Sequence, residues 1–314
     1  MTCLITRPER FTAVALSVTP DSAASRVHRH TGGLRTARPF RFGVSLLNVG
    51  SRSSWHDRVR KAESLGYDVL QVPDHLGMAA PFPALVAAAD VTSMRLGTYV
   101  LNAGVLSPAY LARDVADVYR LTDGRLELGL GAGYVPAEFE AVGAPFGTGG
   151  ERLRELEKTL TATRALLAAE ADRPLPPVML SGAGERMIRL GGREADIFSF
   201  SVMSGLAPGT APEDALAHRV QVLREAAGDR IDDVELNLFV AAVGASTDEV
   251  DLTIIRNASG LEDDQLVQVP GVLVGSPREL ADRLLRYRET FGTSYISVLE
   301  PHMSAFAEVI KQLR

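Results

Sequence analysis

The chain has 314 residues, a single cysteine and a formal net charge of −6, and 46% of its residues are hydrophobic. This length suits one large domain or two small ones. The acidic balance disfavours nucleic-acid binding, and no apolar run approaches the ~20 residues that span a membrane. One cysteine excludes an intrachain disulfide and fits a reducing compartment. We therefore expect a cytoplasmic protein with neither a nucleic-acid nor a membrane partner.

The first 38 residues differ from the rest in charge. They hold six arginines, no lysine and only two acidic residues. Their short apolar piece makes a poor signal peptide, because it lacks a clear small-residue cleavage site. We expect residues 1–38 to be a disordered arm, or translated sequence upstream of the true start. The folded domain is predicted to span 39–314.

Eight strand candidates follow, and helical patterns separate most of them. The predicted strands cover 40–46, 68–72, 95–101, 125–130, 177–180, 195–200, 234–243 and 294–299. The predicted helices cover 55–65, 84–92, 109–121, 151–169 and 212–227, with others starting near 185 and at 303. An insertion between the seventh and eighth strands holds a helix near 247–257 and a second one. The second starts at Ser276, with Pro277 and Glu279 as start signals.

This alternation indicates a parallel sheet covered by helices. Eight units favour a closed (β/α)8 TIM barrel, although an open Rossmann sheet stays an alternative. Gly129, Gly131 and Gly133 do not have the spacing of the dinucleotide-binding fingerprint, and they follow the fourth strand, not the first. In such a barrel, reactive groups lie at the C-terminal ends of the strands.

Three of these strand ends carry residues suited to ligand chemistry. The glycines after the fourth strand would let the backbone approach a ligand closely. Asp74 and His75 end the second strand, and a histidine can pass a proton near neutral pH. Ser-Gly-Ala-Gly at 181–184 precedes a helix whose free amides suit a phosphate. The structural alternatives are a loop-capping Asp74, a satisfied His75 and a plain βα turn at 181–184.

These motifs occur in a recognisable order. Val-Pro-Asp-His ends at 75, Leu-Gly-Thr-Tyr-Val-Leu-Asn spans 96–102, the glycine segment spans 123–134, and Gly-Gly-Arg-Glu-Ala-Asp spans 191–196. With 181–184, the set resembles the bacterial luciferase-like flavin and deazaflavin oxidoreductases, and most of all the branch that uses coenzyme F420. The resemblance covers about 39–314 and implies a luciferase-like TIM barrel with an insertion between strands seven and eight.

The resemblance also implies roles for individual residues. His75 would lie against the cofactor ring and serve in proton transfer or substrate contact, and Asp74 would help to hold the ring; both are candidate catalytic residues. The bond Tyr99–Val100 matches a non-proline cis peptide that many relatives have. The implied cofactor contacts are Asp74, Tyr99, Val100, Asn102, Ala132, Gly133, Gly182, Ala183, Gly184 and Arg186.

Candidate substrate contacts are Leu47, Trp55, Phe82 and Tyr134. Trp55 is equally compatible with a place in the core. Tyr134 stands where the sugar-phosphate dehydrogenases of this family have a catalytic glutamate, which disfavours a sugar-phosphate substrate.

The leading hypothesis is an oxidoreductase that exchanges a hydride between F420 and a small organic substrate at the barrel mouth. One alternative is an FMN-dependent monooxygenase that uses reduced flavin and O2. More distant alternatives are a non-catalytic flavin-binding barrel and a metal-assisted hydrolase using Asp74 and His75. The histidines show no metal-ligand spacing, so no metal site is predicted. The resemblance alone implies a homodimer.

Overall fold

The computed structural model describes residues 38–169, 175–201, 210–253, 255–256, 261 and 263–314. The compact unit described below is Ala37–Arg314. The predicted arm lies outside the described residues except for Arg38, and its disorder stays a prediction.

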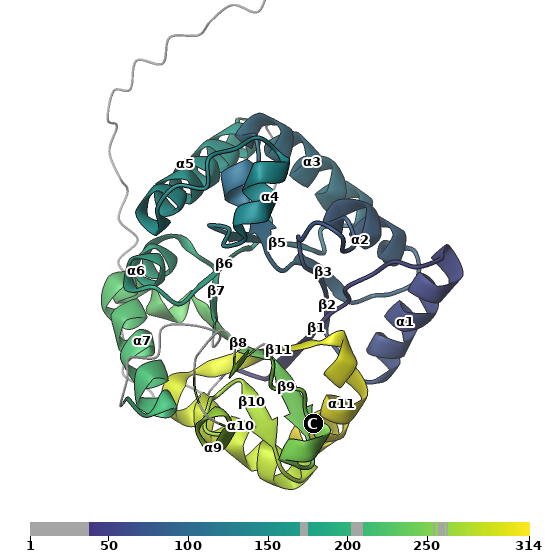
Figure 1. Cartoon of the computed structure of the whole chain (residues 1–314). Helices are drawn as coiled ribbons and strands as arrows, with labels where there is room; N and C mark the ends of the chain where they lie inside the picture. The colour runs from purple at the N-terminus through teal and green to yellow at the C-terminus, as the bar shows by residue number, and fades with distance from the viewer. Residues whose placement is uncertain (1–37, 170–174, 202–209, 254, 257–260, 262) are drawn as a thin grey trace, which may run out of the picture. The chain divides into compact units, whose positions relative to one another are not determined.

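The unit is a closed parallel barrel, as predicted (Figure 1). Its strands are β1 (Arg41–Ser45), β2 (Val69–Val72), β3 (Arg95–Thr98), β4 (Leu101–Asn102), β5 (Leu126–Gly131), β6 (Val178–Gly182), β7 (Ile197–Phe200), β8 (Glu235–Val240) and β11 (Thr293–Leu299). Neighbouring strands pair in chain order, β11 pairs with both β8 and β1, and β5 pairs with both β3 and β4. Since β3 and β4 occupy one strand position, the ring has eight positions, and the open-sheet alternative is wrong.

Helices lie around the outside of the ring (Figure 1). They are α1 (Arg52–Ser64), α2 (Pro81–Ala89), α3 (Pro108–Leu121), α4 (Pro136–Ala141), α5 (Gly149–Ala168), α6 (Glu185–Glu194), α7 (Pro212–Ala227), α9 (Asp263–Leu266), α10 (Pro277–Phe291) and α11 (Met303–Leu313). Short 3-10 turns are η1 (Ala103–Val105), η2 (Gly228–Asp232), η3 (Thr247–Glu249) and η4 (Glu300–His302). In the described part of the chain, every helix is too short or too polar to cross a bilayer.

The insertion differs in detail from its prediction. The expected strand 234–243 is divided into β8 and a separate β9 (Ala242–Gly244), which pairs in parallel with β10 (Val272–Val274) outside the barrel sheet. Within the expected helix near 247–257, the turn η3 comes first and residues 253, 255 and 256 are helical, while residues 254 and 257 lie outside the described ranges. The predicted start of α10 is confirmed, because Ser276 and Glu279 cap it reciprocally.

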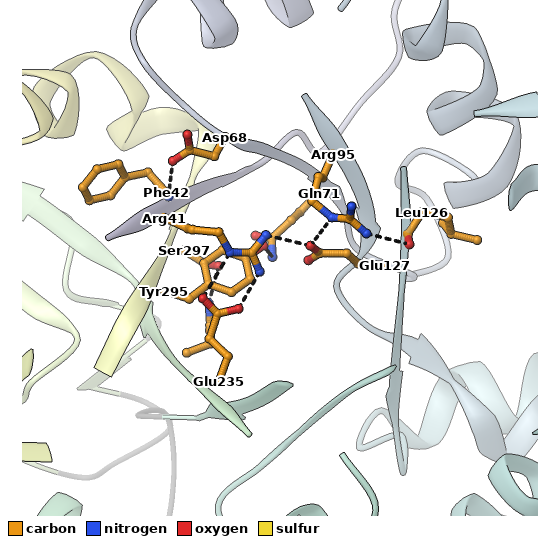
Figure 2. Close-up of polar contacts among 11 residues, drawn as sticks. Arg41, Phe42, Asp68, Gln71, Arg95, Leu126, Glu127, Glu235, Tyr295 and Ser297 are labelled. Carbon is orange, nitrogen blue, oxygen red and sulfur yellow. Dashed lines mark hydrogen bonds and ion pairs between the residues drawn. The ribbon is translucent and has the colours of Figure 1, made fainter. Parts of the chain in front are cut away.

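Charged residues fill the barrel at the N-terminal ends of its strands (Figure 2). Arg41 of β1 pairs with Glu127 of β5 at 2.8 Å and with Glu235 of β8 at 2.6 Å, and Arg95 of β3 joins Glu127 at 2.6 Å. The Arg41 guanidinium also lies 4.4 Å from the ring centre of Tyr295. This end of a TIM barrel serves stability, and the cluster ties four strand positions together.

An apolar cluster and a group of hydrogen-bonded polar side chains also lie on the barrel strands. Val69, Met179, Ile197 and Tyr295 form a buried apolar cluster against which Tyr99 and Val100 pack. The Tyr99 hydroxyl lies 2.7 Å from Ser199 Oγ and 3.1 Å from Asn237 Oδ1. Burial raises the pKa of Tyr99, which keeps the phenol neutral. The Tyr99 side chain therefore points into the barrel.

Candidate active site

The glycines after β5 pack mainly against β3 and β4. A Cβ on Gly129 would lie 2.0 Å from the carbonyl oxygen of Thr98, and one on Gly131 would lie 2.7 Å from Val100 Cγ2. The Tyr99–Val100 bond that the two glycines flank is cis, as the resemblance implied. The expectation that Gly129 and Gly131 make room for a ligand is therefore corrected. Their missing side chains make room for residues 98–100 of the neighbouring strand position.

The third glycine lies against Asn102. Gly133 has a φ of +73°, which favours glycine, and a Cβ there would lie 2.3 Å from Asn102 Oδ1. Asn102 Oδ1 accepts from Gly104 N at 3.1 Å, and the Asn102 backbone N–H donates to Asp74 Oδ2 at 3.0 Å. Asp74 therefore fixes Asn102 in place across β2 and β4. This contact positions the Asn102 backbone, and a catalytic role for Asp74 stays a prediction.

The side-chain amide of Asn102 is the unsatisfied donor of this rim. Asn102 is 6% exposed, and its Nδ2 has no hydrogen-bond partner among the residues that the structure describes. A buried donor without a partner costs about 1–3 kcal/mol. An acceptor on a bound molecule would remove that cost.

His75 lies between two polar side chains of the β5–α5 connection. Its Nδ1 is 2.8 Å from Glu138 Oε1, and its Nε2 is 3.2 Å from the Tyr134 hydroxyl. A carboxylate accepts hydrogen bonds and cannot donate them, so Nδ1 carries a proton. Nε2 is therefore the nitrogen left to face the Tyr134 hydroxyl, and a role for it in proton transfer stays a prediction.

Ser181 and Gly182 end β6, and residues 183 and 184 form an open turn into α6. Gly184 is the N-cap, no described side chain caps the helix, and no atom lies within 4 Å of a Cβ built on Gly184. Glu185 of the first turn pairs with Arg189 at 2.7 Å, which offsets its charge. Arg186 is exposed, and its Nη1 lies 3.5 Å from a Cβ built on Gly150, at the start of α5. No described side chain caps the amides at the start of α6, and Arg186 lies toward the start of α5, so a phosphate site at this turn stays a prediction.

The predicted substrate contacts separate into two groups. Tyr134 is exposed at the rim, and Leu47 and Phe82 are half-buried. Trp55 is fully buried and donates from Nε1 to the Ala84 carbonyl at 3.1 Å. The structure supports the core alternative for Trp55 and corrects its assignment as a substrate contact.

Glu138 is the site residue that the sequence analysis missed. Its only signal was an acidic residue in a short segment after the glycines, and α4, which carries it, was not predicted. The described residues contain no group of three or more His, Cys, Asp or Glu side chains that could hold a metal ion.

Comparison with known families places this chain. Residues 36–259 match the model of the luciferase-like monooxygenase family. The chain belongs to this family of oxidoreductases. One relative of this chain is a 5,10-methylenetetrahydromethanopterin reductase of Methanolobus tindarius, which is 28% identical over 130 residues. That stretch is 41% of this chain and 39% of the relative, so the match spans well under half of either protein.

Solved structures of low sequence identity to this chain have the same fold. The coenzyme F420-dependent tetrahydromethanopterin reductase of Methanopyrus kandleri matches with a TM-score of 0.66 and 16% identity, over 88% of this chain and 100% of that one. The EDTA monooxygenase of Chelativorans sp. BNC1 matches with a TM-score of 0.69 and 14% identity, over 88% and 93%. At these identities the matches establish the barrel and leave the cofactor open.

Proposed function

We propose that this protein exchanges a hydride between coenzyme F420 and a small organic substrate at the barrel mouth. The observation that carries the proposal is the unsatisfied Asn102 amide, held at the same rim as His75 Nε2. The similarity to a methylenetetrahydromethanopterin reductase supports a reductase over a monooxygenase.

The described residues fit a flat phosphorylated cofactor. Asn102 Nδ2 would supply a donor for a ring acceptor, and Gly133 leaves the space that the Asn102 side-chain amide occupies. The amides at the start of α6 suit a phosphate, because a helix N-terminus favours negative charge. A bound deazaflavin would supply the hydride chemistry. The protein residues would orient the ring and move the accompanying proton through His75.

An FMN-dependent monooxygenase is the second candidate. The matched family model carries the description luciferase-like monooxygenase, and a known monooxygenase shares the fold. FMN also carries a phosphate, so the turn at 181–184 fits either cofactor.

Gly184→Asp tests the phosphate-binding turn. An aspartate at an N-cap accepts from the first free amides and stabilises the helix, and Gly184 has a φ of −72° and open space for it. The variant should therefore be at least as stable as the wild type, while its Kd for F420 rises about tenfold or more. Calorimetric titration of the full chain with F420 and with FMN measures both affinities.

Gly184→Ala is the matched control, since it adds a Cβ without an acceptor and should leave the Kd within about threefold of wild type. Tight FMN binding with no F420 binding would move the assignment to the monooxygenase. Unchanged F420 binding in Gly184→Asp would show that the cofactor phosphate does not bind at this turn.

A further inference from the structure

Glu138 holds the loop that carries His75 by two contacts at one oxygen. Its Oε1 accepts from His75 Nδ1 at 2.8 Å and from the Leu76 backbone N–H at 3.2 Å. The His75 and Glu138 side chains are 26% and 14% exposed. Glu138 thus fixes both the backbone after β2 and the orientation of the imidazole.

Tyr134 continues this chain of contacts to the solvent. Its hydroxyl lies 3.2 Å from His75 Nε2, and the two rings meet edge to face, with centroids 5.5 Å apart at 81°. Tyr134 is 72% exposed, whereas the His75 side chain, whose Nε2 its hydroxyl contacts, is 26% exposed. A substrate that approaches His75 along this line meets Tyr134 first.

We propose that Tyr134 is the catalytic residue that exchanges the proton with the substrate, with His75 as its proton source and Glu138 as the positioning residue. The substrate class that this arrangement suits is a carbonyl compound, or the corresponding alcohol in reverse. This inference rests on the proposed hydride exchange.

The step balances with the reduced deazaflavin as the hydride donor. The hydride forms a C–H bond at the carbonyl carbon, and the π electron pair of the C=O bond moves to oxygen. That oxygen takes the Tyr134 proton, and the tyrosine oxygen takes the proton of His75 Nε2. His75 ends neutral, with its Nδ1 proton still donated to Glu138. Alcohol oxidation runs the same transfers backwards, with neutral His75 as the base.

The environment of Tyr134 explains why the histidine is required. Partial desolvation of the phenol and the nearby charge of Glu138 raise the pKa of Tyr134 above its usual value. A free phenolate is therefore unfavourable at this position. Transfer from Tyr134 needs a replacement proton from His75 in the same step, and the 3.2 Å contact supplies the path.

Two exposed apolar residues follow His75 closely in the chain. Leu76 and Met78, in the loop directly after His75, are both exposed. The loop is held as a turn by the hydrogen bond from Met78 N to the His75 carbonyl at 3.0 Å. A carbonyl compound with an aliphatic or aromatic substituent would cover these side chains on binding.

The hydrogen-bond chain can be tested without cofactor or substrate, by ¹⁵N NMR of the His75 ring. Neutral His75 should be the Nδ1–H tautomer in the wild type, and Glu138→Ala should shift it toward Nε2–H. Glu140→Ala is the matched control, because Glu140 is exposed on the same helix α4. An Nε2–H tautomer in the wild type would overturn the relay.

Proton transfer is tested by single-turnover oxidation of reduced F420 with 2-octanone and with benzaldehyde. Tyr134→Phe should lower the rate about 10²-fold or more and leave KM and the F420 Kd nearly unchanged. The solvent deuterium isotope effect of the wild type should shrink in this variant. Tyr110→Phe, which alters an exposed tyrosine on α3, should match the wild type.

The outcomes separate the two proposals. Turnover by the wild type with an equal rate in Tyr134→Phe would overturn the relay and leave the proposed function standing. Normal F420 binding without turnover of either carbonyl probe would overturn the proposed substrate class. Absence of F420 binding would overturn the proposed function itself.

Discussion

Gly129→Ala is expected to lower the free energy of unfolding by about 3 kcal/mol or more, at the upper end of what overpacking costs. The added Cβ would lie 2.0 Å from the carbonyl oxygen of Thr98. That backbone cannot move away freely, because Thr98 Oγ1 donates to the Gly129 carbonyl at 2.9 Å and accepts from its N–H at 2.8 Å. Since domains are stable by about 5–15 kcal/mol, a large part of the stability would be lost. Urea unfolding followed by circular dichroism measures the change.

The control is Gly149→Ala. Gly149 is the first residue of α5, and the nearest atom to its built Cβ is Arg152 Nη2 at 3.9 Å. This variant should unfold within about 0.5 kcal/mol of the wild type. If Gly129→Ala were as stable as the wild type, the account of close packing between β5 and β3 would be wrong.

Glu127→Ala is expected to cost about 3 kcal/mol, the lower end for breaking a buried ion pair. Glu127 is 3% exposed at its side chain and accepts from both Arg41 and Arg95 (Figure 2). Its removal leaves Arg41 with Glu235 alone and takes the carboxylate partner from Arg95. The midpoint of urea unfolding should fall with an unchanged m-value.

The loss in Glu127→Ala should be the same from pH 6 to pH 9. Burial acts to lower the pKa of Arg41, but the charge of Glu127 and the hydrogen bond to Glu235 outweigh it and hold the pKa above its usual value. A raised pKa gives stability that is complete below the unfolded-state pKa of arginine, which lies far above pH 9, so Arg41 stays charged throughout this range. Glu140→Ala, at an exposed carboxylate, should change stability by less than about 0.5 kcal/mol. An effect of that small size in Glu127→Ala would show that the cluster contributes nothing.

Local chemistry made much of the barrel predictable. Ser276, Pro277 and Glu279 predicted the start of α10 because capping depends only on neighbouring residues. The insertion was less predictable, since β9 and β10 form by pairing segments far apart in the chain. The charged cluster around Arg41 was not predicted for the same reason, because its partner Glu235 is 194 residues away in the chain.

At the site, the family resemblance placed His75, Asn102 and the cis bond on the correct strand ends. It assigned no role to Glu138, which reaches His75 across 63 residues. Trp55 had even sequence alternatives, and only its complete burial decided between them.

The most direct test of the central claim is oxidation of a reduced cofactor by the full chain in the absence of O2, with 2-octanone or benzaldehyde as acceptor. Hydride exchange predicts that reduced F420 is oxidised anaerobically, in an amount equal to the alcohol formed, and that reduced FMN is not. Consumption of reduced FMN that requires O2, with reduced F420 left unchanged, would contradict the account and assign the protein to the monooxygenases.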